Sequence, residues 1–270
     1  MRSRVISRPS DRWQSVADPW STVRVLHRRK GLPDGWERIV DERVAVWNLL
    51  NEAERASLEA MSDWLLRHKH WEAARGFALT DDITVTIAAQ AALVVLGLGV
   101  DEYREVSAII VYPTSMNSRG VYAGPVRGTV TDGVVPVLGE AHDHRGPVLL
   151  AWDQASHAAR HPGSGHNVVF HEFAHKIDML DNIVDGTPPL EHRVDFHRWI
   201  DVCTEAYEAL RAGDDRPPLQ TYGATNPAEF FAVATEAFFD VPVALLHHEP
   251  NLYEVMRDFY KQDPATRGRH

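Results

Sequence analysis

The sequence lacks several features that would place a protein outside the cell or in a membrane. Cys203 is the single cysteine, so no disulfide can form within the chain. The longest apolar run, residues 83–100, is interrupted by Thr84, Thr86, Gln90 and two glycines, which suits a buried helix better than a transmembrane helix. No apolar signal core follows the N-terminus. These absences predict a cytoplasmic protein that does not enter a membrane.

Charge is distributed unevenly along the chain. The formal net charge is −10, yet residues 1–30 carry eight Lys or Arg against two Asp. We expect residues 1–20 to form a basic, flexible arm. The acidic remainder and the lack of aromatic residues interleaved with basic ones argue against direct binding of nucleic acid.

The pattern of apolar residues predicts an α+β protein. A helical region should run from residue 32 to about 74, and a second helix, capped by Thr80, should reach about residue 96. Strands are expected at 105–112 and 146–152, a ribbon or hairpin at 120–137, and a loop at about 153–166. Further helices are expected at 166–180, 192–212, 226–239 and 250–261. A small sheet should pack on one side of the helix at 166–180, with helices on the other side.

The helix at 166–180 contains the residues that indicate a function. His171, Glu172, Phe173, Ala174 and His175 form the pattern H-E-x-x-H. On a helix the two histidines lie one turn apart on one face, roughly 6 Å from each other, so they can share one tetrahedral metal ion. Glu172 is too short to join them as a ligand but is placed to accept a proton from water. The pattern therefore predicts a zinc site that activates water.

A catalytic zinc site needs a third protein ligand, and several carboxylates could supply it. Asp181 lies where a metzincin places its third ligand, but Asp178 occupies the position of the glycine that turns the chain in that motif. Asp178 is better placed to hydrogen-bond a ligand histidine. A downstream glutamate, Glu229 or Glu236, would complete the His₂Glu set of gluzincins.

The residues alone leave the choice between these two glutamates open. Asn226, Pro227 and Glu229 have the spacing of a helix capping box, in which the glutamate side chain bonds the backbone and is not free to bind a metal. Glu236 lies seven residues further along on the same helix face. It could bind the metal itself, or it could hydrogen-bond a ligand histidine.

Three segments give the chain a resemblance to a known family. Residues 81–90, 167–175 and 222–236 resemble the Mlc titration factor A family of zinc-dependent peptidases, whose catalytic region is similar to that of anthrax lethal factor. The resemblance extends over about residues 22–265. It implies one Zn²⁺ bound by His171, His175 and Glu229, with Glu172 as the general base and Tyr222 as a hydrogen-bond donor to the transition state.

The resemblance also implies a fold and a function. Residues 21–265 should form a single zincin-like, gluzincin-type domain, followed by a tail at 266–270. The implied activity is an aminopeptidase-like hydrolysis of peptides. A second implied role is regulatory, through binding of a transcriptional repressor of the Mlc type. The alternative to an enzyme is therefore a non-catalytic, repressor-binding protein with a structural zinc. A pure binding protein would have no need for Glu172 between the two histidines.

Overall fold

The computed structural model describes residues 25–27, 31–74, 76–114, 146–190 and 193–267. The expected arm at 1–20 and the expected hairpin at 120–137 lie outside these residues. Four strands are described: β1 (Val25–His27), β2 (His70–Ala73), β3 (Ala108–Tyr112) and β4 (Val148–Ala151). The helices are α1 (Trp36–Arg43), α2 (Glu52–His68), α3 (Asp81–Val94), α4 (Trp152–Arg160), α5 (Val168–Asp178), α6 (Arg193–Ala212), α7 (Pro227–Asp240), α8 (Pro242–His248) and α9 (Pro250–Tyr260). Short 3₁₀ turns include η3 (Met179–Asp181), η4 (Thr221–Ala224) and η5 (Pro264–Thr266).

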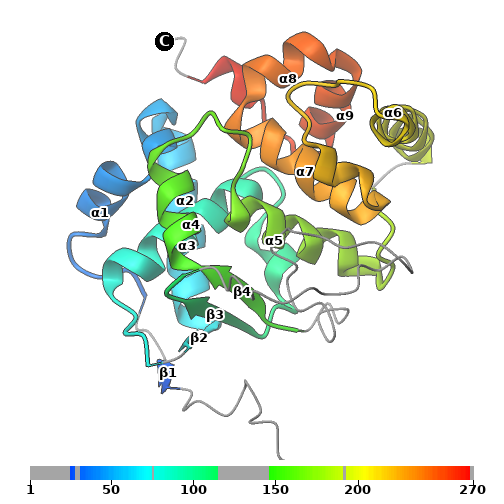
Figure 1. Cartoon of the computed structure of the whole chain (residues 1–270). Helices are drawn as coiled ribbons and strands as arrows, with labels where there is room; N and C mark the ends of the chain where they lie inside the picture. Colours follow the sequence, from blue (N-terminus) through cyan, green and yellow to red (C-terminus); the bar gives the residue numbers. More distant parts are fainter. Residues whose placement is uncertain (1–24, 28–30, 75, 115–145, 191–192, 268–270) are drawn as a thin grey trace, which may run out of the picture.

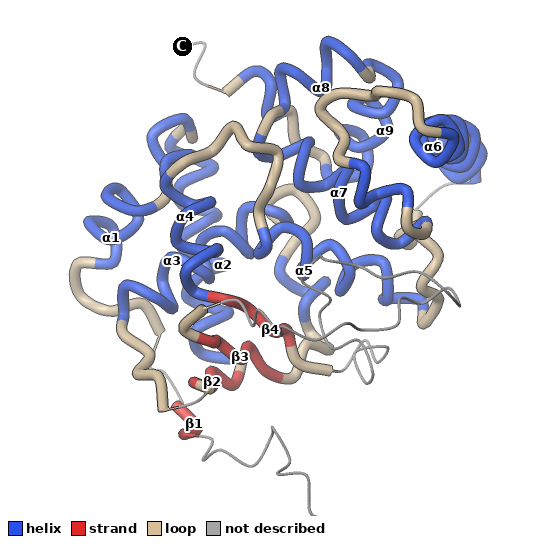
Figure 2. The backbone as a smooth tube through the Cα atoms, viewed as in Figure 1, coloured by secondary structure: helices blue, strands red, loops and turns tan. Residues whose placement is uncertain are grey.

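The fold is α+β and mostly helical, as the sequence predicts, with one small sheet (Figure 2). The strand order is β1-β2-β3-β4. The three strands β2, β3 and β4 run parallel, and β1 pairs antiparallel with β2. Trp71 of β2 pairs with Ile109 of β3, which in turn pairs with Val148 of β4. All three side chains are buried, so this part of the sheet belongs to the core.

Helix α5 lies in the middle of the molecule (Figure 1). The sheet and helices α1 to α4 lie on one side of it, and α6 to α9 lie on the other. Its closest helical neighbours are α7 and α3, both almost entirely buried. A helix that is apolar all round and enclosed by others forms a core in which polar side chains need defined partners. The hydrogen-bond partners of the polar residues in α5 and α7 therefore matter for the site.

The buried character of α7 also bears on the membrane question. No single helix in the described part of the chain is long and apolar enough to cross a membrane. Helices α7 and α8 reach the required length and composition when taken together, but they bend by 115° at the break between them.

Some elements differ from those expected. Strand β2 lies inside the region predicted to be helical. The strand was not predicted because Trp71, Glu72 and Ala73 are all buried and do not alternate between buried and exposed. Helix α4 occupies most of the predicted loop at 153–166, with Ala155, Ala158 and Ala159 buried along one face. The predicted tail begins within η5, where the Arg267 guanidinium pairs with Glu54 at 2.9 Å.

Candidate metal centre

The start of α5 is fixed by a side-chain cap. Asn167 precedes the helix, and its Oδ1 accepts hydrogen bonds from the backbone N–H groups of Val169 (3.0 Å) and Phe170 (3.2 Å). Two otherwise unpaired donors of the first turn are thereby satisfied. Apolar residues of α5, including Phe173, are buried, whereas His171, Glu172 and His175 remain partly exposed. The two apolar residues of the motif thus face the core, whereas His171, Glu172 and His175 lie on a partly exposed face of the helix.

Three side-chain atoms from α5 and α7 converge at this face. Glu229 Oε2 lies 3.1 Å from His171 Nε2 and 3.5 Å from His175 Nε2. The two histidine nitrogens lie 3.2 Å from each other. Within the described residues, these three side chains form the one group of histidine, cysteine and acidic residues that could hold a metal ion.

The spacing of these atoms fits a metal ion. In a tetrahedral site with bonds of about 2.0–2.1 Å, neighbouring ligand atoms are about 3.3–3.4 Å apart. The three observed separations, 3.1, 3.2 and 3.5 Å, bracket that value. Two imidazoles and one carboxylate also form a donor set that leaves a fourth position open for water or substrate. The distances between the ligand atoms and the chemistry of the donors therefore both fit a metal ion.

At Glu229 the structure shows a helix cap from Asn226 but no capping box made by the glutamate side chain. Its backbone N–H donates to Asn226 Oδ1 at 2.9 Å, so Asn226 caps α7. Its side chain instead lies against the two histidines. Asparagine at the cap position satisfies the first turn without help from the glutamate carboxylate. Capping of the backbone and placement of the carboxylate in the site are thus compatible.

Three carboxylates form a stripe along α7. Glu229, Glu236 and Asp240 are spaced by seven and four residues, which places them on one helix face. Glu236 Oε1 accepts a hydrogen bond from His171 Nδ1 at 2.7 Å. Asp240 Oδ2 accepts from the backbone N–H groups of Gly163 (3.0 Å) and Gly165 (2.6 Å), in the loop before α5. The stripe therefore contacts α5 and the segment that leads into it.

The charges in the site are strongly coupled. Burial by itself would lower the pKa of His171, but hydrogen bonds to Glu229 and Glu236 outweigh it and raise this pKa. Burial would raise the pKa of Glu229, but hydrogen bonds from His171 and His175 lower it. An imidazolium between two carboxylates places positive charge where a metal cation would sit. Burial raises the pKa of the Glu172 carboxyl, and the two histidines oppose that rise.

Tyr222 borders the site from η4. Its ring centroid lies 6.1 Å from that of His171, and the residue is 37% exposed. Burial raises the pKa of its phenol, and Glu229 raises it further through charge and a hydrogen bond. Tyr222 therefore stays protonated at neutral pH and can act as a hydrogen-bond donor.

The structure separates the two aspartates that follow the motif. Asp178 is buried, and its Oδ2 accepts a 3.1 Å hydrogen bond from the Gly186 N–H. Asp178 Oδ1 and His175 Nδ1 are both buried without a hydrogen-bond partner among the described residues. Asp181 is exposed, and its Oδ1 accepts from the Ile183 N–H at 2.9 Å. Asp181 does not belong to the three-residue group.

Gly186 explains how the loop after α5 reaches α7. Its φ is +77°, and a Cβ built on it would lie 2.3 Å from the Pro227 carbonyl oxygen. Only glycine fits this close approach without displacing the start of α7. Sequence reasoning missed Gly186, since contact with Pro227 joins segments that are distant in sequence.

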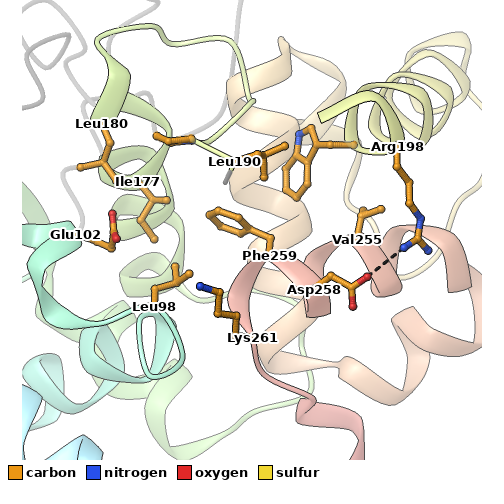
Figure 3. Close-up of a pocket in the computed structure, with 12 residues that line it drawn as sticks. Leu98, Glu102, Ile177, Leu180, Leu190, Arg198, Val255, Asp258, Phe259 and Lys261 are labelled. Carbon is orange, nitrogen blue, oxygen red and sulfur yellow. Dashed lines mark hydrogen bonds and ion pairs between the residues drawn. The ribbon is translucent and has the colours of Figure 1, made fainter. Parts of the chain in front are cut away.

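A cavity of about 510 Å³ lies behind α5 (Figure 3). Ile177 lines it and is two residues after His175, about 200° around the helix. Arg198 at its rim is paired with Asp258 at 3.0 Å. None of the three converging side chains lines this cavity, so it is separate from the candidate metal centre.

Two histidines one helical turn apart, facing a carboxylate on a second helix, define a metal site of the kind found in metallopeptidases. The family model described as glucose-regulated metallo-peptidase M90 matches residues 17–261. The chain belongs to this family of metallopeptidases.

Individual relatives cover most of the chain. An uncharacterised protein of Synechocystis is 36% identical over 248 residues, which is 91% of this chain and 89% of that protein. Mlc titration factor A of Serratia proteamaculans is 32% identical, over 81% of this chain and 84% of its own length. Mlc titration factor A of Pectobacterium atrosepticum is 30% identical, over 81% and 83%. The resemblance derived from the sequence is confirmed.

Proposed function

We propose that this chain is a zinc-dependent peptidase of the gluzincin type, with a zincin-like fold over residues 21–265 and aminopeptidase-like action on peptides. The observation that carries the proposal is the triangle of His171 Nε2, His175 Nε2 and Glu229 Oε2, with edges of 3.1 to 3.5 Å. These three side chains would hold the ion. Glu172 lies next to His171 in α5 and is not part of the triangle, so it is free for proton transfer.

The chemistry divides between the ion and the protein. Zinc, when bound, supplies Lewis-acid polarisation of the scissile carbonyl and of the attacking water. Glu172 accepts a proton from that water and delivers it to the leaving amine. The raised pKa of Glu172 brings this carboxyl closer to the range in which it can both accept and release a proton. The Tyr222 hydroxyl donates a hydrogen bond to the carbonyl oxygen as negative charge develops on it.

Two further carboxylates support the ligands in this proposal. Glu236 accepts from His171 Nδ1, so the lone pair of Nε2 points toward His175 and Glu229. Asp178 lies one turn after His175, and each has a buried polar atom without a partner among the described residues. No hydrogen bond joins these two side chains in the structure, and we propose that Asp178 supports His175 through the charge of its nearby carboxylate.

Metal analysis combined with activity measurements tests the enzyme proposal. The purified protein should contain about one zinc per chain and cleave chromogenic amino-acid or peptide substrates. A chelator should abolish cleavage, and added Zn²⁺ should restore it. Stoichiometric zinc without cleavage of any substrate in a broad panel would favour the non-catalytic alternative, in which the zinc is structural.

A regulatory role is a second candidate, favoured by the name Mlc titration factor A, which relatives with 30–32% identity carry. We propose that the chain also binds a transcriptional repressor of the Mlc type through a surface outside the metal centre. The single cysteine agrees with a cytoplasmic setting for both roles.

Repressor binding should survive in Glu172→Gln. A pull-down with that variant, with and without residues 1–20, tests the surface and the basic arm separately. Loss of capture in the full-length Glu172→Gln chain would contradict a surface outside the centre.

A further inference from the structure

A chain of buried hydrogen bonds leads from α3 to His171. Its last link is Glu236, whose two oxygens are both in use. Oε1 accepts from His171 Nδ1 at 2.7 Å, and Oε2 accepts from the Asn167 backbone N–H at 2.5 Å. Glu236 is 5% exposed, so water has little access to it. A carboxylate held at both oxygens cannot rotate, and the ring that donates to it is held as well.

Asn167 forms the middle of this chain. Its Oδ1 caps α5, and its backbone N–H reaches Glu236. Its Nδ2 donates to Gln90 Oε1 at 2.9 Å. The two backbone donors at Oδ1 determine which end of this amide faces Gln90. Asn167 is 2% exposed, so without Gln90 its Nδ2 would be a buried donor with no acceptor, which is unfavourable.

Gln90 anchors the chain on α3. Its Nε2 donates to the carbonyl oxygens of Thr86 (3.2 Å) in α3 and Ala155 (3.3 Å) in α4. With Oε1 bound to Asn167, its amide is fully engaged, and the residue is 1% exposed. Helix α5 lies between α3 and α7 and contacts both (Figure 1). This series of hydrogen bonds therefore connects the position of His171 to α3, α4, α5 and α7.

We propose that Asn167 and Gln90 are positioning residues for His171, acting through Glu236 to aim its Nε2 at the metal position. This inference rests on the proposed zinc site and extends it to residues that contact no ligand atom. Partners that orient metal-bound histidines through their second ring nitrogen typically change metal affinity about 10- to 100-fold when removed. A role confined to helix capping and core packing would instead change stability alone.

The protein contains a close match for Gln90 that does not lead to the site. Gln262 is also buried, and its Nε2 donates to two α3 carbonyls, those of Leu93 (3.0 Å) and Val94 (3.1 Å). Its Oε1 accepts from Arg267 at 2.7 Å. Gln90→Met and Gln262→Met therefore each remove a buried amide bonded to the α3 backbone, Gln90 from within α3 and Gln262 from the segment after α9. They differ in whether the lost amide is connected to His171.

The test is the Zn²⁺ dissociation constant of each full-length variant, measured by competition with a chromophoric chelator, together with thermal unfolding of the metal-free samples. Gln90→Met should weaken zinc binding about 10-fold or more. Gln262→Met should lose comparable thermal stability and bind zinc like the parent. Equal zinc affinity in Gln90→Met and the parent would overturn the proposal. A parent that binds no zinc would instead refute the proposed function.

Asn167→Ser provides a second test at the next link and decides the matter if Gln90→Met does not fold. Serine can still cap α5, and the backbone N–H to Glu236 remains, but the donor to Gln90 is lost. Zinc binding should weaken in this variant while the helix content is retained. The double variant should bind zinc about as weakly as the single variant with the lower zinc affinity, because both changes interrupt the same series of hydrogen bonds. Parent-like affinity in Asn167→Ser, or additive losses in the double variant, would contradict the proposal.

Discussion

The carboxylate of Glu236 accepts a 2.7 Å hydrogen bond from Nδ1 of His171, a residue 65 positions earlier in the chain. The other nitrogen of the same ring lies 3.1 Å from Glu229. One imidazole is thus placed between two glutamates of α7, seven residues apart. Glu229 lies nearer to the metal position, whereas Glu236 bonds the opposite nitrogen of the His171 ring. This division of roles leads to distinct expectations for the acidic residues around the site.

The third ligand can be tested by comparing three substitutions. Glu229→Ala should lose zinc affinity markedly, because it removes one corner of the triangle. Glu236→Ala should weaken binding by an intermediate amount, about 10- to 100-fold, because His171 stays but loses its orienting partner. Asp181→Ala, the control, should bind zinc like the parent. Metal analysis after dialysis, with chelator competition, measures all three. Loss of zinc in Asp181→Ala alone would favour a metzincin-like site.

Glu172 should be required for turnover and dispensable for the metal. Glu172→Gln keeps the size of the side chain but removes the proton acceptor. We expect nearly stoichiometric zinc and loss of peptidase activity. The matched control is Glu59→Gln, on the exposed face of α2, which should retain both. Substantial turnover by zinc-loaded Glu172→Gln would exclude Glu172 as the general base.

Tyr222 should affect the transition state more than substrate binding. Tyr222→Phe should retain zinc and lower kcat about 10- to 1,000-fold, with KM little changed, because the lost hydrogen bond forms mainly as charge develops. Tyr207→Phe is the control, since the Tyr207 ring packs 5.9 Å from Phe230 in the helical core. Steady-state kinetics on one substrate measures both variants. A defect confined to KM would give Tyr222 a role in substrate positioning.

Lys69 should make stability depend on pH. Burial lowers its pKa from 10.5 to about 8, with Glu105 opposing the change. Between these values the unfolded chain binds more protons at this position than the folded protein does, so stability rises with pH. Urea unfolding at about pH 7 and about pH 9.5 should show the parent gaining stability relative to Lys69→Met. A constant or falling difference would show that the folded protein keeps Lys69 charged over this range.

The sequence predicted the part of the site that depends on local spacing. The motif helix was expected at 166–180 and spans 168–178, because its histidines and its apolar face both follow the helical period. Strand β2 was missed since its residues are buried without alternation. The choice between Glu229 and Glu236 could not be made from local pattern. Both lie on one face of α7, and their roles differ only in which nitrogen of His171 each one meets.

The contacts around Asn167 could not be predicted from the sequence either. Its partners Gln90 and Glu236 are 77 and 69 residues away in the chain. Helical periodicity indicates which residues share a face but not which face of another helix they meet. The sequence analysis did not identify the cap at Asn167, and its connection to α3 and α7 depends on tertiary packing.

The stripe of Glu229, Glu236 and Asp240 also sets the register between two helices. If α7 slid by one turn against α5, all three carboxylates would leave the histidines and backbone N–H groups that they now meet. Glu236 and Asp240 are one turn apart, so one of them would move toward the present position of the other, but the remaining two carboxylates would be buried without their partners, which is strongly unfavourable. The alignment is therefore fixed by the protein itself, before any ion binds. Small zinc domains fold only when the metal arrives. Here the ion would enter a preorganised site, exchanging with protons while the fold remains unchanged.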